Sequence, residues 1–570
     1  TLANFYFPEP TEQELRVIWN HVGLGIEVLN ALFEEQQSAA ATRTNAMARA
    51  FYRIGLESLL ELHKATGQDE YLDDAFELMQ RSKGHLLEKY LNEKERIASA
   101  DQELETKIDE LKGERYLVQQ QLTTTDEEAE LQSRLAEIEQ ELNEYYAQLE
   151  KENPAYYQFL EKPSRLEIRD VENYLSKIDA TYLEYFVADQ QVFALVISDK
   201  DAQLNHWSLE REMRKETKEL LGELENLNAD EYAEKAYELY DGFFQPIENK
   251  LKTKSLIVVP DSWMAQLPLE ILISEKTTGE VPFNELDYLI NDYSFSYLYS
   301  ADMLPANMHV EENKKQSSLY LGIAPGFSGE TNQIAEVKRS GASRPALIGA
   351  REEVESAAEL FQQKVKTSDE NLEELIKEEG GNYSILHLAT HAEIDEQSPL
   401  NSRIFLDAKS RKDGEDGILH QYELFNIDLS NELTVLSACK TGSGPWIEGE
   451  GVNSLARGFI YSGSRSIVLS YWDVNDQSSS ELMNSFFQNL NKGKGRSESL
   501  RNAKLDYLRG ADAIQANPYY WAGFVLFGET TPLERADPGA NFWLYAIPII
   551  VLILAAAALW IARGRKTSEE

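Results

Sequence analysis

The stretch Leu433-Thr-Val-Leu-Ser-Ala-Cys439-Lys-Thr-Gly442 contains the only cysteine among 570 residues. Its first four residues, Leu433 to Leu436, are apolar or β-branched, which predicts a short buried strand. Gly442 then turns the chain into a loop. Because open α/β sheets bind ligands just outside the carboxyl ends of their strands, Cys439 stands where a parallel sheet presents a reactive group. The alternative is a small core side chain, since free cysteine is among the most often buried residue types.

A second predicted strand ends on a histidine. It is Ser384-Ile-Leu-His387-Leu-Ala-Thr-His391, and it precedes the cysteine strand. A thiol becomes a nucleophile when a base removes its proton, and histidine does this near neutral pH. Two neighbouring parallel strands that end at His391 and Cys439 would place a base beside a nucleophile. The pair therefore favours a catalytic cysteine over a core cysteine.

His387 lies four residues before His391, so the two side chains would point to one side of an extended strand. A metal site is one interpretation of this spacing, but further ligands would have to lie nearby. A hydrogen-bonded structural histidine is the preferred interpretation of His387. The sequence predicts no metal and no cofactor.

The chain resembles the CHAT family, in which caspase-like cysteine peptidase domains occur beside TPR repeats and which has separase as a distant relative. The resemblance starts with the His391 and Cys439 segments and covers about residues 166–532. The further matching segments are Ile257-Val-Val-Pro-Asp261, Leu267-Pro-Leu-Glu-Ile271, Tyr288-Leu-Ile-Asn-Asp-Tyr293, Gly449-Glu-Gly451, Ser454-Leu-Ala-Arg457 and Leu469-Ser-Tyr-Trp-Asp473-Val-Asn-Asp476.

The resemblance implies roles for three residues. Cys439 would be the nucleophile, and His391 the general base and later the general acid. The oxyanion hole would consist of the backbone N–H groups of Cys439 and of the residue after the histidine. The family usually has glycine after the histidine, whereas this chain has Ala392. Alanine keeps the N–H group but loses the backbone freedom of glycine, so activity would suffer if the position requires a positive φ.

The resemblance also implies a specificity pocket. In separase-like relatives a matching Trp-Asp segment supplies an acidic pocket, and Asp473 and Asp476 follow Trp472 here. A carboxylate in a cleft would select an arginine or lysine before the scissile bond through a charge-assisted hydrogen bond. The alternative is that the two aspartates cap a loop or carry surface charge.

The fold class follows from strands that alternate with helices, which predict a mainly parallel, three-layer α/β sandwich. By the resemblance, it is caspase-like. Residues 166–345 would be a first, non-catalytic half and residues 346–532 the catalytic half. Strands are predicted at 182–187, 192–197, 256–259, 319–323, 403–406 and 466–471, besides the two that end at His391 and Cys439.

Helices are predicted before this domain. Apolar residues recur at helical spacing within residues 1–92, where small and aromatic side chains resemble a degenerate TPR pair; a generic helical bundle is the equal alternative. Because one or two such units cannot bury their faces alone, further repeats are expected before Thr1. Residues 93–165 are predicted to form an antiparallel, coiled-coil-like hairpin. Its apolar seams are Leu104, Ile108, Leu111, Val118 and Leu122, and Leu131, Leu135, Ile138, Leu142, Tyr145 and Leu149.

A membrane anchor is predicted at the carboxyl end. Residues 542–562 carry no charge and could span a bilayer as one helix, after a linker at 533–541. The tail, residues 563–570, starts with basic residues, so the positive-inside rule predicts a cytoplasmic tail and an extracytoplasmic bulk. A tail anchor with the bulk inside is the alternative.

Composition limits the partners. The formal net charge of −43 opposes a phosphate backbone, so nucleic acid is not an expected partner. The chain has 42% hydrophobic residues, which is enough for a sizeable core. We therefore predict a membrane-anchored cysteine endopeptidase that acts on a protein or peptide substrate and binds a protein activator through its helical region. The alternative is an inactive CHAT-fold scaffold that binds partners through its helices.

Overall fold

The structure is a computed structural model, and it describes most of the chain between residues 10 and 534. The described residues are 10–35, 41–83, 107, 111, 118, 131, 133–138, 140–142, 144–145, 166–188, 190–277, 281–304, 318–325, 348–363, 365–366, 371–395, 402–406, 417–424, 427–437, 442, 446–447, 451–452, 455–474 and 476–534. Cys439 and the segment 542–562 lie outside them. Among the described helices, none is long and apolar enough to cross a membrane.

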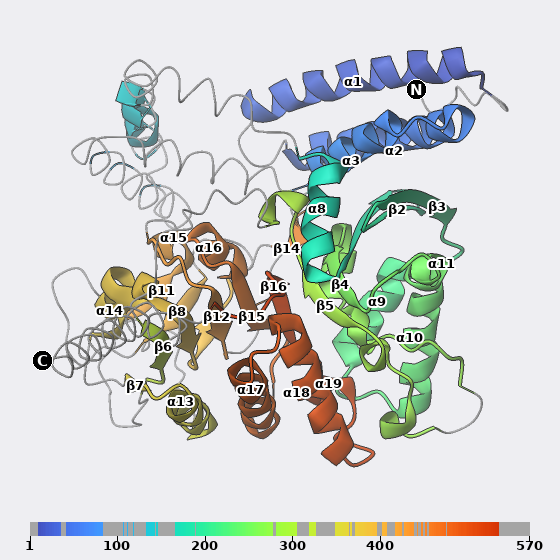
Figure 1. Cartoon of the computed structure of the whole chain (residues 1–570). Coiled ribbons are helices and arrows are strands. Elements are labelled where there is room, and N and C mark those ends of the chain that lie inside the picture. Colours follow the sequence, from blue (N-terminus) through green and yellow to red (C-terminus); the bar gives the residue numbers. More distant parts are fainter. Residues whose placement is uncertain are drawn as a thin grey trace, which may run out of the picture. The chain divides into compact units, whose positions relative to one another are not determined.

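One sheet of eleven strands runs through the domain that follows the helices, in the order β3-β2-β1-β4-β5-β16-β15-β12-β8-β6-β7 (Figure 1). Most neighbouring strands are parallel, which confirms the predicted mainly parallel sheet. The strands are β1 Thr181–Ala188, β2 Gln191–Ser198, β3 Asp201–Ser208, β4 Ser255–Val259, β5 Ser294–Tyr297, β6 Ser318–Ile323, β7 Val365–Lys366, β8 Tyr383–Leu388, β12 Leu433–Leu436, β15 Ser466–Ser470 and β16 Phe524–Gly528.

The strand β16 joins the two halves of the sheet. It is parallel to β5, with Phe527 opposite Tyr297, and antiparallel to β15. The strands β1, β4 and β5 therefore run opposite to β15, β12, β8, β6 and β7, and the carboxyl ends of these two groups lie at opposite edges of the sheet. Gly528, at the end of β16, has a φ of +93°, and a Cβ there would lie 2.2 Å from the carbonyl oxygen of Arg465. Only glycine fits this position.

Helices cover both faces of the β6–β15 part of the sheet, as expected for three layers (Figure 1). On one side lie α13 Ile348–Leu360, α17 Asp476–Asn491 and α18 Arg496–Gly510, and on the other α15 Gln421–Leu424 and α16 Leu455–Tyr461. The remaining helices of this domain are α8 Ile168–Ile178, α9 Met213–Glu223, α10 Ala229–Phe243, α11 Gln245–Glu248, α14 Leu372–Glu379 and α19 Pro518–Trp521. The α13 helix packs against α17, and α17 against α18.

The N-terminal region is helical, as predicted, and consists of α1 Glu12–Glu35, α2 Ala41–Thr66 and α3 Glu70–Arg81. Gly67, with a φ of +68°, ends α2. Two buried ion pairs fasten these helices to the sheet. Arg49 pairs with Asp261, and Lys83 lies 2.9 Å from Glu184. The TPR-like interpretation of these helices remains a prediction.

The predicted hairpin region is described only in part. Its described residues are helical, and four of the predicted seam positions are buried: Leu111, Val118, Ile138 and Leu142. The pairing of the two helices lies outside the described residues.

Candidate active site

The predicted histidine and cysteine follow two adjacent strands at the centre of the second half of the sheet. The strands β8 and β12 are parallel, and Leu388 is opposite Leu436. His391 comes three residues after Leu388, and Cys439 comes three residues after Leu436. The register therefore brings the two strand exits to the same level, although Cys439 itself is not described.

His391 and Ala392 are held by a small second sheet. It consists of β9 Ala392–Glu393, β10 Arg403–Phe405 and β11 Ile418–His420. The backbone N–H of Phe405 donates to the carbonyl oxygen of His391 at 2.9 Å, and Ala392 is opposite Ile404. Because Ala392 is part of an extended strand and has no positive φ, alanine adopts this conformation without strain. The role of the Ala392 backbone N–H in an oxyanion hole stays a prediction.

Gly442, which follows β12, packs closely against the neighbouring strand β15. The backbone N–H of Gly442 donates to the carbonyl oxygen of Ser470 at 2.7 Å. A Cβ at position 442 would lie 2.1 Å from Cδ1 of Leu469 and 3.1 Å from the Ser470 oxygen. Glycine is required by this close approach rather than by an unusual φ. The contact fixes where the chain passes shortly after Cys439.

His387 lies beneath these strand exits, in a buried chain of hydrogen bonds. Its Nδ1 is 2.8 Å from the hydroxyl of Tyr320, and its Nε2 is 2.8 Å from Oε1 of Glu353. The other carboxylate oxygen of Glu353 accepts a hydrogen bond from the Ser437 hydroxyl at 3.1 Å. His387, Glu353 and Tyr320 are almost completely buried. Both ring nitrogens of His387 are thus engaged, as expected for a structural histidine.

Burial raises the pKa of Tyr320 well above its usual value, and the nearby carboxylate of Glu353 raises it further. The phenol therefore stays neutral and can donate to the ring of His387. This chain of hydrogen bonds ends at Ser437, two residues before Cys439. The backbone N–H of Ser437 also donates to the carbonyl oxygen of Leu388, at 3.0 Å. Ser437 thus has both its backbone and its side chain fixed at the end of β12.

Glu353 was not predicted from the sequence as a buried residue. It lies on α13 four residues before Ala357 and eight before Phe361, and all three are buried. A glutamate on the apolar face of a helix is the signal that could have identified it. Its neighbour Glu352 is exposed, so residue type alone does not separate the two.

Asp473 and Asp476 lie at the same sheet edge as His391, because β15 is parallel to β12 and its end leads directly to them. Asp473 is exposed, and Asp476 is the first residue of α17. The segment before them is fixed: the Tyr471 hydroxyl donates to the Ala265 carbonyl oxygen, and the Trp472 indole N–H to that of Tyr519, both at 2.9 Å. A carboxylate in the first turn of a helix is also favoured by the helix dipole, so this placement is compatible with both interpretations of Asp476.

The described residues contain no group of three or more histidine, cysteine, aspartate or glutamate side chains arranged to hold a metal ion. The arrangement at the sheet edge offers a histidine, backbone N–H groups and carboxylates, which are the groups that acyl-transfer chemistry uses.

Comparison with known families identifies the class of protein. The family model of the CHAT domain matches residues 233–529, which is more than half of the chain. The chain therefore belongs to the CHAT domain family. No match was found among curated proteins.

Several solved structures are similar to this chain at low identity. The Arg specific cysteine proteinase gingipain R is 11% identical with a TM-score of 0.32, over 54% of this chain and 68% of that one. A complex of the pro- and mature domains of RgpB from Porphyromonas gingivalis is 12% identical, with a TM-score of 0.31, over 54% of this chain and 70% of that one. Separase from Saccharomyces cerevisiae, in complex with securin, is 10% identical with a TM-score of 0.40. That match covers 91% of this chain but only 40% of separase.

Proposed function

We propose that the chain is a cysteine endopeptidase in which Cys439 is the nucleophile and His391 the general base. The observation that supports this proposal is the pairing of Leu388 in β8 with Leu436 in β12, because His391 and Cys439 each follow the paired leucine by three residues in the sequence. Membership of the CHAT domain family supports the same class of reaction.

In the proposed reaction, His391 takes the proton of the Cys439 thiol, and the thiolate attacks the scissile carbonyl carbon. The backbone N–H groups of Cys439 and Ala392 stabilise the oxyanion that forms. The C–N bond breaks as His391 gives the proton to the leaving amine, and the acyl group remains on sulfur as a thioester. Water, deprotonated by His391, then hydrolyses the thioester and restores the thiol.

We propose further that the residue before the scissile bond is arginine or lysine and that Asp473 or Asp476 binds it. Asp473 and Asp476 follow the end of β15, and β15 pairs with β12, the strand that leads to Cys439. A charge-assisted hydrogen bond to a desolvated carboxylate contributes about 1.5–3 kcal/mol, which corresponds to roughly a ten- to hundredfold preference.

A peptide library tests both proposals. Wild-type chain, supplied with candidate activator proteins, is expected to cleave after basic residues, whereas Cys439→Ala cleaves nothing. Asp473→Ala or Asp476→Ala, assayed separately, is expected to lower the ratio of kcat/KM for an Arg substrate over a Leu substrate. If wild type and Cys439→Ala give the same products, the peptidase proposal is wrong. If wild type prefers Leu, or neither aspartate variant changes the ratio, only the basic pocket is wrong.

We also propose that residues 542–562 anchor the chain in a membrane, since they carry no charge over a length that can span a bilayer. The full chain is expected to stay with membranes through a carbonate wash, and a chain that lacks residues 542–562 to be released. Equal partitioning of the two chains would contradict the anchor. The orientation follows from whether added protease reaches the bulk of the chain in sealed vesicles.

A further inference from the structure

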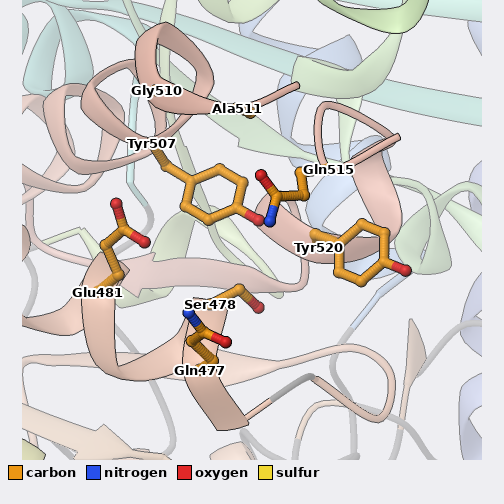
Figure 2. Close-up of a pocket in the computed structure, with 8 residues that line it drawn as sticks. All are labelled: Gln477, Ser478, Glu481, Tyr507, Gly510, Ala511, Gln515 and Tyr520. Atoms are coloured by element: carbon orange, nitrogen blue, oxygen red, sulfur yellow. The ribbon is translucent and has the colours of Figure 1, made fainter. Parts of the chain in front are cut away.

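A cavity of about 200 Å³ lies between the beginning of α17, the end of α18 and the turn that leads to α19 (Figure 2). Gln477 and Glu481 line it from α17, and Tyr507 lines it from α18. Gln515 and Tyr520 close it from the other side. In Figure 2 the Tyr507 ring lies between the carboxylate of Glu481 and the amide of Gln515.

The cavity is at the same edge of the sheet as the candidate active site. The α17 helix begins at Asp476, shortly after β15 ends at Ser470. The hydrogen bond from the Trp472 indole to the carbonyl oxygen of Tyr519 ties the exit of β15 to the residue beside Tyr520. The cavity is therefore joined to the exit of β15, the segment that leads to Asp473 and Asp476.

The charge around the cavity is negative. Among the described residues, the structure gives the exposed carboxylate of Glu481 no hydrogen bond and no ion pair. The pKa of Tyr507 is raised to about 12, first by burial and then by Glu481, Tyr520 and Asp512. The wall also includes Gly510, at the carboxyl end of α18, where the helix dipole favours a cation. The basic residue of that last turn, Arg509, is paired with Asp506.

We propose that this cavity binds the side chain of a lysine or arginine in the polypeptide substrate. The open carboxylate of Glu481, beside the Tyr507 ring in the cavity wall (Figure 2), is an acceptor that suits an ammonium or guanidinium group. The rings of Tyr507 and Tyr520, which line the cavity, offer apolar contacts for the methylene groups of such a side chain. The carboxylate of Asp512 accepts hydrogen bonds from the backbone N–H groups of Ile514 and Gln515. We therefore assign Asp512 to holding the turn and not to binding the cation.

This inference rests on the proposed function for the identity of the bound chain as a substrate. It adds a second basic residue to that substrate, separate from the one assigned to Asp473 or Asp476. The expected substrate class is therefore a polypeptide in which two basic residues are separated by a fixed distance.

Fluorescence anisotropy tests the inference with the full chain carrying Cys439→Ala, so that bound peptide is not cleaved. The probes are fluorescein-labelled alanine-based peptides that contain two arginines at increasing separation, and a matched peptide with one arginine. At one preferred separation the second arginine is expected to tighten binding about fivefold at physiological salt, the range of a partly exposed ion pair.

Two charge-matched variants give the control. Glu481→Lys is expected to remove the gain from the second arginine. Glu379→Lys makes the same change of charge at an exposed residue of α14, which does not line the cavity, and should leave the gain intact. The proposal is wrong if Glu481→Lys keeps the gain in affinity from the second arginine, or if both variants lose it equally. It is also wrong if the gain does not depend on the separation of the arginines, or if no peptide binds measurably.

The same variants separate this inference from the proposed function. A chain with Cys439 intact that cleaves peptides, while Glu481→Lys binds like the parent, keeps the peptidase function and loses the cavity assignment. A chain that binds paired arginines through Glu481 and cleaves no peptide keeps the cavity and loses the peptidase.

Discussion

A His391→Ala variant is expected to keep the fold and to lower kcat/KM for peptide cleavage by about 10²–10⁴-fold, the usual contribution of a general acid–base residue. His391 is only partly buried, and the small sheet formed by β9, β10 and β11 holds its backbone through the hydrogen bond from Phe405. Removal of the imidazole should therefore affect proton transfer more than stability. Steady-state cleavage of an Arg substrate measures the loss.

The single cysteine provides a second measurement that needs no substrate. Alkylation by iodoacetamide reports on Cys439 alone. Near pH 6 the wild type is expected to react about tenfold faster than His391→Ala, because a nearby imidazole increases the fraction of thiolate. His206→Ala, on the edge strand β3, is the matched control and should react like the wild type. Equal alkylation rates in all three proteins would show that His391 does not act on the thiol.

A Glu353→Ala variant is expected to lower the free energy of unfolding by about 2–5 kcal/mol. The change removes the buried partner of both the His387 ring and the Ser437 hydroxyl, and each group would remain away from water without a hydrogen bond. Chemical denaturation followed by circular dichroism measures the loss. Glu353→Gln, which keeps an acceptor for Ser437, should lose less.

Glu352→Ala is the control for this effect, because Glu352 is the exposed neighbour on the same helix. Its substitution should change the free energy of unfolding by no more than about 0.5 kcal/mol. If the two alanine variants unfold at the same denaturant concentration, the buried chain of hydrogen bonds does not contribute to stability as the geometry indicates.

The strands with strong local patterns could be predicted from the sequence. The apolar run at 433–436 coincides with β12, and the strands predicted at 182–187 and 192–197 coincide with β1 and β2. These segments are short apolar runs rich in β-branched and aromatic residues, which is typical of a buried strand. The strand β3 was not predicted, because Leu204 is its only buried residue and an edge strand has little apolar signal.

Other features depend on contacts between distant segments, which periodicity cannot reveal. The sequence gives no indication that β16 pairs with both β5 and β15, since pairing depends on partners far along the chain. The prediction that His387 and His391 share one side of a strand also differs from the structure, where β8 ends at Leu388. The positions of His391 and Ala392 then follow from pairing with β10, a segment that the strand pattern did not connect to them.

The central position of β16 has a consequence for synthesis on the ribosome. While the chain between Tyr297 and Phe524 is still being made, β5 and β15 each have one edge without its partner. Unpaired strand edges favour association with other chains, and pairing across a long sequence separation is slow. The nascent protein is therefore expected to need protection by chaperones until residues 524–528 have emerged. The hydrolytic activity proposed for the chain should appear only after these residues have emerged, so that synthesis of β16 would delay it.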